Sequence, residues 1–307
     1  MTTIVALSIQ AILVLILSPL SIGLVRWFKA RLQGRRGAPP WLVYTALLTT
    51  LKKQNVMSES ASWIFRFVPF VVLGMAVFLV ISLPLLFLNG GLPQIDLFVL
   101  AGVLSLGSVF LVLGGLDAAT AFGGMGASRE MTIAALIEPV ALVAFSAFAV
   151  VAGSSSVQDI FGNGMSIFSH PALVLSFAAL ILVALAENAR YPVDNPATHL
   201  ELTMVHEAMV LEYSGPYLAL LEYASSIKLT VFLVLLGNLV WVKPSVSLDF
   251  GTVGLAVAGV LLTLIVGSAA LALLESSIAK MRFFRLQEYM SVAFFLALSG
   301  FILVFLL

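Results

Sequence analysis

The chain has no cysteine, and only 10% of its 307 residues are charged. Without thiolates, it offers no ligands for a cysteine-bound iron–sulfur cluster or zinc ion, and it can form no disulfide. So few charges cannot cover a soluble domain, in which about 25% of residues are usually charged. Fifteen basic residues balance fifteen acidic ones, so net charge gives no reason to expect nucleic-acid binding.

Histidine is scarce as well. The three histidines, His170, His199 and His206, all fall outside the apolar runs. A haem held between helices in a bilayer would need axial ligands inside those runs. We therefore expect no metal and no cofactor in this chain.

Apolar residues dominate what remains. They make up 61% of the chain, and its mean hydropathy is +1.14. A helix needs about 20 apolar residues to cross a bilayer. The runs of that length lie at about 4–25, 67–88, 97–116, 131–152, 171–187, 226–242, 252–274 and 288–307. The sequence therefore predicts an all-α integral membrane protein, a single transmembrane domain over 1–307 with about eight spans.

Positive charge is divided unequally between the two sides of this arrangement. If 26–66 faces the cytoplasm, every lysine and arginine except Lys243 falls on the cytoplasmic side. Cytoplasmic loops carry such an excess in membrane proteins. We therefore predict that both termini lie on the outer side. The cytoplasmic loops that would meet a partner are expected at about 26–66, 117–130, 188–225 and 275–287.

The segment AENARYPVDNPATHLELTMVHEAMVLEYSG, residues 186–215, is the richest in chemistry. Asp194-Asn195-Pro196 is typical of a helix start. A helix from there would place His199 and His206 on one face and Glu201 and Glu212 on another. It would be either a solvated amphipathic helix or, given its many apolar residues, a packed one. Carboxylates in a packed segment would exchange protons near neutral pH.

Glu138 lies inside the fourth apolar run. A charge deep in a bilayer costs on the order of 3 kcal/mol, so such a group usually faces protein, water or a proton path. The alternative is a neutral acid that is hydrogen-bonded to a neighbouring helix. Lys228 could pair with one of the carboxylates at the span boundaries, which are Asp117, Glu130, Glu187, Glu222 and Glu275.

Two other motifs carry little chemistry. Gly123-Gly124-Met125-Gly126 follows no strand and lacks the P-loop lysine, so we expect a flexible turn. His206-Glu207 lacks the second histidine of a zinc-protease motif, so a metal site is not predicted there.

Several strings occur in an order that resembles one family. They are QGRRG at 33–37, GASRE at 126–130, Glu138-Pro139, AENARYPVD at 186–194 and EYSG at 212–215. The chain resembles the NuoH-like family over nearly its whole length. This family is the eight-helix membrane subunit 1 of respiratory complex I, which forms the floor of the quinone chamber.

Departures from the complex I pattern point to one branch. Ala197 and His199 stand where complex I subunits usually carry acidic residues, and about three extra residues precede Glu212. The string THLELTMVHEAM is more similar to the membrane subunits of group 4 nickel–iron hydrogenases, of the formate hydrogenlyase and hydrogenase-4 type. These departures argue against quinone binding.

The resemblance implies a membrane anchor and proton-coupling subunit of an energy-converting oxidoreductase, with no catalytic centre of its own. Its partners would be hydrogenase-like large and small subunits, an iron–sulfur protein and antiporter-like membrane subunits. Iron–sulfur clusters, and the nickel–iron site of a hydrogenase, would lie in those partners. The location implied is the prokaryotic inner membrane.

The candidate site residues fall into two groups. The proton path is expected at Glu138, Glu187, Glu201, Glu207, Glu212 and Glu222. Docking and electrostatic contacts are expected at Arg35, Arg36, Arg129, Arg190, Asp194, His199 and His206.

Three alternatives stay open at this point. The chain could be the quinone-chamber subunit of a complex I-like NADH or ferredoxin dehydrogenase. It could be an independent secondary transporter that uses Glu138 and Glu187, although no inverted repeat is evident. It could also be a passive anchor whose carboxylates only stabilise helix packing.

Overall fold

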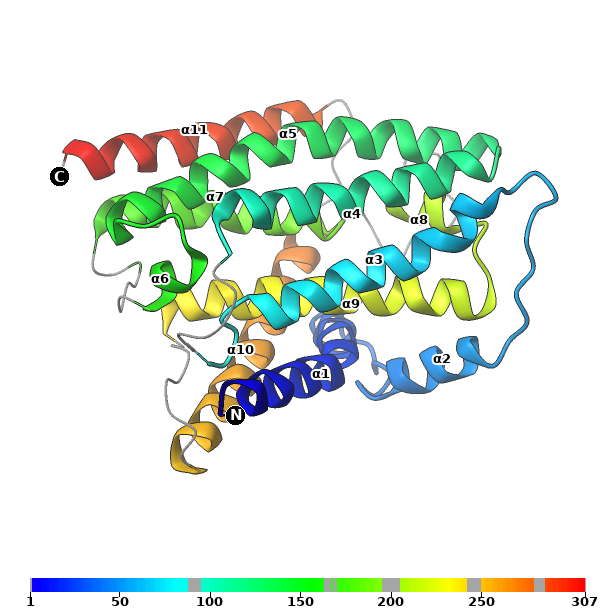
Figure 1. The fold of residues 1–307 in the computed structure, drawn as a ribbon, viewed down its shortest axis with the longest axis horizontal. Coiled ribbons are helices and arrows are strands. Elements are labelled where there is room, and N and C mark those ends of the chain that lie inside the picture. Colours follow the sequence, from blue (N-terminus) through cyan, green and yellow to red (C-terminus); the bar gives the residue numbers. More distant parts are fainter. Residues whose placement is uncertain are drawn as a thin grey trace.

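A computed structural model describes residues 2–87, 95–162, 167, 170–194, 205–241, 250–278 and 285–306. Helices make up most of this part of the chain (Figure 1). In chain order they are α1 (Thr2–Leu32), α2 (Leu42–Leu51), α3 (Trp63–Ser82), α4 (Leu97–Asp117), α5 (Ala121–Ala152), α6 (Val157–Gly162), α7 (Pro171–Glu187), α8 (His206–Val210), α9 (Gly215–Val240), α10 (Phe250–Ser277) and α11 (Leu286–Leu306).

Within the described residues, seven helices are long and apolar enough to cross a membrane: α1, α3, α4, α5, α9, α10 and α11. The shorter apolar helix α7 has 17 residues and coincides with the predicted span at 171–187. A spanning helix needs about 17 to 25 residues, so α7 is at the lower limit. The prediction of an all-α multi-pass membrane protein is confirmed. The side that each terminus faces stays a prediction.

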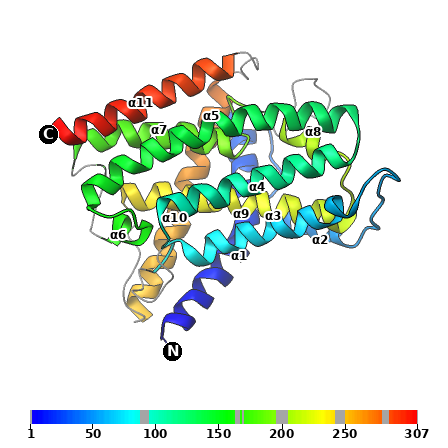
Figure 2. The same cartoon turned by 45° about the horizontal axis from the view of Figure 1, so that its top comes forward.

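Helix α9 lies at the centre of the bundle. Its apolar window is 61% buried, against values between 28% and 39% for the other candidate spans. It packs against α1, α2, α3 and α10, while α11 packs on α7 and α5 (Figure 1). Helix α10 crosses the other long helices steeply, and α1 also inclines away from them in Figure 2. Most of α9 is therefore enclosed by other helices.

Two helices begin earlier than predicted. The predicted spans start at 131 and 226, whereas α5 begins at Ala121 and α9 at Gly215. The prediction placed Glu130 and Glu222 outside the spans as boundary residues, but they lie inside these helices and line cavities. Much of the expected loop at 117–130, and the last part of the one at 188–225, is therefore helical.

The predicted turn at Gly123–Gly126 is wrong, because these residues form the first turns of α5. The Oγ1 atom of Thr120 accepts a hydrogen bond from the Gly123 N–H at 3.2 Å and starts the helix. A Cβ atom added at Gly126 would meet the Cβ atom of Ala208 at 2.9 Å. The glycines therefore permit α8 to lie close against α5.

A proline kink ties α1 to two other helices. Pro19 lies inside α1 and has no N–H to donate to the carbonyl of Leu15. The Tyr223 hydroxyl of α9 donates to that carbonyl at 2.9 Å. The Tyr44 hydroxyl of α2 donates to the neighbouring carbonyl of Ile16 at 2.5 Å. These two hydrogen bonds hold α2 and α9 against the middle of α1.

Candidate functional site

The largest cavity described is strongly charged. It has a volume of about 710 Å³, and we call it the chamber. Its walls come from α1, α2, α8, α9, the end of α10 and the segment after α7. The ionisable residues that line it are Arg26, Lys29, Arg35, Arg36, Arg190, Asp194, His206, Glu207, Glu222 and Glu275. Many of the predicted site residues are thus brought together from distant parts of the chain.

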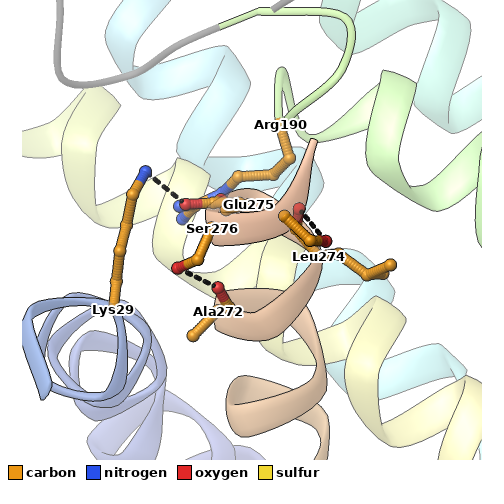
Figure 3. Close-up of polar contacts among 7 residues, drawn as sticks. Lys29, Arg190, Ala272, Leu274, Glu275 and Ser276 are labelled. Atoms are coloured by element: carbon orange, nitrogen blue, oxygen red, sulfur yellow. Dashed lines mark hydrogen bonds and ion pairs between the residues drawn. The ribbon is translucent and has the colours of Figure 1, made fainter. Parts of the chain in front are cut away.

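A buried carboxylate joins three elements at the wall of the chamber. Glu275 of α10 has a side chain that is only 2% exposed. Its Oε2 atom lies 2.9 Å from Nζ of Lys29, and its Oε1 atom lies 3.3 Å from Nη1 of Arg190 (Figure 3). Burial lowers the pKa of Arg190, and the Glu275 carboxylate opposes that shift. One carboxylate is therefore shared by two cations.

Asp194 organises the next wall. It is 2% exposed, and its Oδ2 atom accepts hydrogen bonds from the backbone N–H groups of Val205 at 3.2 Å and His206 at 3.3 Å. These bonds satisfy donors at the start of α8, where an anion is also favoured by the helix dipole. Asp194 therefore places the His206 side chain beside the chamber.

His206 is neutral at pH 7. Its pKa is lowered to about 4, chiefly by burial and also by the Lys228 cation, while Asp194 opposes the shift. The residue is half-buried and lines two cavities. A neutral imidazole can both donate and accept a hydrogen bond.

A second cavity adjoins the chamber, and we call it the inner cavity. It has a volume of about 80 Å³ and lies among α3, α4, α5, α7 and α9. Its ionisable lining residues are Glu130, Glu187, His206 and Lys228. His206 lines the chamber too, so it stands between the two spaces. Since one water needs about 10 to 15 Å³ of such volume, the inner cavity has room for several.

Lys228 and Glu187 form an ion pair inside this cavity. Nζ of Lys228 lies 2.6 Å from Oε1 of Glu187, without the alignment of a hydrogen bond. The side chain of Glu187 is 8% exposed and that of Lys228 is 25% exposed. The prediction that Lys228 pairs with a boundary carboxylate is confirmed, with Glu187 as its partner.

A third and smaller space leads to Glu138. This deep cavity has a volume of about 20 Å³, room for about one water, and both Glu138 and Glu187 line it. Glu187 is therefore shared by the inner and deep cavities. The ionisable groups follow one another from the chamber through His206 to the inner cavity, and from there through Glu187 to Glu138.

The remaining predicted residues lie elsewhere. Arg129 and Glu212 line none of these three cavities, as far as the described residues go. His199 and Glu201 lie outside the described residues, and so does the part of the expected helix over 195–204. Its described end, α8, stops at Val210 rather than at Gly215.

Four residues of these cavities are not among the predicted site residues: Lys29, Glu130, Lys228 and Glu275. The available signal was a charge inside or just beyond an apolar run, which Glu130 and Lys228 both show. The pairing of Lys29 with Glu275 left no such signal, because these residues are 246 positions apart.

Fold and site together define a class: a helical membrane protein with a charged chamber at one end of its bundle and titratable groups that continue into the bundle. Residues 4–307 match the family described as NADH dehydrogenase, and the chain belongs to that family. The resemblance drawn from the motifs is thereby confirmed.

Two relatives from Escherichia coli (strain K12) identify the branch. The chain is 30% identical to "Formate hydrogenlyase subunit 4" over 281 residues, which cover 89% of this chain and 90% of that protein. It is 33% identical to "Hydrogenase-4 component C" over 228 residues, covering 72% and 70%. The expected hydrogenase branch of the family is confirmed.

A solved structure shares the fold. It belongs to the membrane-bound sulfane sulfur reductase, described as an archaeal respiratory membrane complex. The TM-score is 0.84 with 18% sequence identity, and the match covers 99% of this chain and 100% of that one.

Proposed function

We propose that this chain is the membrane anchor and proton-coupling subunit of a multisubunit energy-converting oxidoreductase in a prokaryotic cell membrane. Its relatives are named as parts of formate hydrogenlyase and hydrogenase-4, and a chain of the same fold occurs in a respiratory membrane complex. The proposal assigns the chain no redox centre of its own.

The observation that carries the proposal is the series of ionisable groups that line adjoining cavities. His206 joins the chamber to the inner cavity, and Glu187 joins the inner cavity to the deep cavity, where Glu138 lies. Ionisable side chains inside a membrane are costly and usually mark an ion or proton path. Water in the small cavities would relay protons between groups that do not touch.

The chamber would receive the partner. Arg35, Arg36 and Arg190 line it, and arginine suits charge-assisted contacts with a protein surface. The partners would be hydrogenase-like large and small subunits and an iron–sulfur protein that carries the clusters, with a nickel–iron site if the complex is a hydrogenase. Antiporter-like membrane subunits would take up the protons that leave Glu138.

A quinone-reducing complex is the second candidate. The volume of the chamber, about 710 Å³, falls within the range of about 300 to 1,000 Å³ usual for small-molecule sites. Ala197 and His199, which replace acidic residues of the complex I pattern, favour the hydrogenase-like reading.

The experiment is purification of the chain from its native membrane in mild detergent, followed by mass spectrometry of what stays bound. We expect a hydrogenase-like large subunit, iron–sulfur proteins and antiporter-like subunits. Nickel in the purified complex would identify a hydrogenase, and stoichiometric quinone would favour the second candidate. A chain that purifies alone and folded, and that transports protons in vesicles by itself, would overturn the proposal in favour of an independent transporter.

A further inference from the structure

Among the described residues that line the inner cavity, acids outnumber bases. Glu130 and Glu187 line it, and among the described residues around it only Lys228 carries a positive charge at neutral pH. His206 adds no charge, because burial lowers its pKa to about 4. Two carboxylates therefore face one ammonium group.

This imbalance has a direct consequence. With both carboxylates ionised, the cavity would contain an uncompensated negative charge among packed helices, which is unfavourable. Asp194 lies near enough to interact with Glu130 and adds further negative potential. Uptake of one proton by either carboxyl group restores neutrality. The charge balance thus favours one neutral acid and one ionised carboxylate beside Lys228.

The position of Lys228 decides which carboxyl group is ionised. Its ammonium lies 2.6 Å from Glu187, so Glu187 is the ionised member in this structure. Glu130 interacts electrostatically with both Lys228 and Glu187, and it lines the same cavity. Lysine has a flexible four-carbon stem, and this one keeps 25% of its surface exposed, so its head has room to move.

We propose that Lys228 is a switch that selects whether Glu130 or Glu187 carries the single proton of the inner cavity. The inference rests on the proposed function and deepens it. With Lys228 on Glu187, the proton stays on Glu130. When the ammonium moves to Glu130, the proton leaves the Glu130 carboxyl group, crosses through cavity water and binds an oxygen of Glu187. The charge of the cavity does not change, and no other group gains or loses a proton.

This exchange gates the step to the deep cavity. Glu187 is the carboxyl group that lines both the inner and the deep cavity, whereas Glu130 lines only the inner one. Only the state with a protonated Glu187 can deliver a proton toward Glu138. Movement of Lys228 would therefore admit one proton at a time.

The test is infrared spectroscopy of the purified complex, which reports protonated carboxyl groups through their C=O band. Difference spectra against the wild type isolate the change in each variant. Glu130→Gln removes the proton-carrying acid, so one band is lost. Glu187→Gln leaves Glu130 as the one described carboxyl group of the inner cavity. Lys228 is then expected to move to Glu130, which loses its proton, so the same band is lost. Lys228→Met removes the cation, so a second protonated carboxyl group appears and the band doubles.

Glu187→Gln separates the switch from a fixed ion pair. With Glu187 replaced, charge balance favours an ionised Glu130 beside Lys228. A band that remained would show that Lys228 cannot move to compensate Glu130, and that result would overturn the proposal. Glu59→Gln, at an exposed position, is the matched control and should leave the band unchanged. This readout follows proton location rather than proton transport. A failed switch can therefore be told from a failure of the proposed function, which would show as unchanged transport in Glu138→Gln.

Discussion

Glu275 and Arg190 lie 85 positions apart in the sequence and meet at 3.3 Å at the wall of the chamber. The same carboxylate contacts Lys29, so α1, α10 and the segment after α7 converge on one buried anion (Figure 3). From Arg190 the chain continues through Asp194, whose carboxylate fixes the start of α8 and hence His206. The arrangement of charges in the chamber thus depends on a contact at its edge.

Replacement of Glu275 tests this dependence. Glu275→Gln should lower the free energy of unfolding by about 3 kcal/mol, because it leaves buried Arg190 without its counter-charge. Thermal unfolding of the purified protein in detergent measures the change. Glu288→Gln, at an exposed position at the start of α11, is the matched control and should have little effect. Equal stability of the two variants would show that the Glu275 contacts do not hold the chamber wall.

Two glycines of α5 give opposite predictions. Gly126→Ala should destabilise the protein, because the new Cβ would lie 2.9 Å from both the Ala208 Cβ and the Val205 carbonyl oxygen and would push α8 away. Gly124→Ala has open space around it, and alanine favours helix over glycine by about 1 kcal/mol, so this variant should be more stable. Thermal unfolding of the two variants and the wild type tests both predictions. A stabilised Gly126→Ala would contradict the close packing of α8 on α5.

The lowered pKa of His206 should make the stability of the protein depend on pH. Its pKa is lowered from 6.5 to about 4 in the folded protein. Between these values the unfolded chain binds a proton that the folded chain does not, so stability is full above about pH 6.5 and falls as the pH drops toward about 4. Melting temperatures measured across this window should decline less steeply in His206→Gln than in the wild type.

The control for this titration is His170→Gln, since His170 is exposed before α7. This variant should keep the wild-type slope. If His206→Gln also kept that slope, His206 would not be a buried neutral histidine, and its place between the chamber and the inner cavity would be wrong.

The sequence predicts the spans well because apolar length alone decides them. It places the starts of α5 and α9 too late, because Glu130 and Glu222 look like loop residues until the cavities that they line are known. Gly123–Gly126 resembles a turn by composition, yet its glycines serve helix packing. The sequence predicts that Lys228 pairs with a boundary carboxylate, but not that Glu187 is the partner. The Glu275 cluster was not, since it depends on how α1 and α10 incline toward each other.

The central claim is that protons pass along the carboxylates from the chamber to Glu138. The most direct measurement is proton translocation per redox turnover in the native complex reconstituted in vesicles, for the wild type, Glu138→Gln and the exposed control Glu59→Gln. We predict that Glu138→Gln assembles fully but translocates at least about tenfold fewer protons, while Glu59→Gln behaves as the wild type, because an amide cannot carry the proton that a carboxyl group passes on. Full translocation by Glu138→Gln, with only lower stability of the complex, would contradict the account and leave the chain a passive anchor.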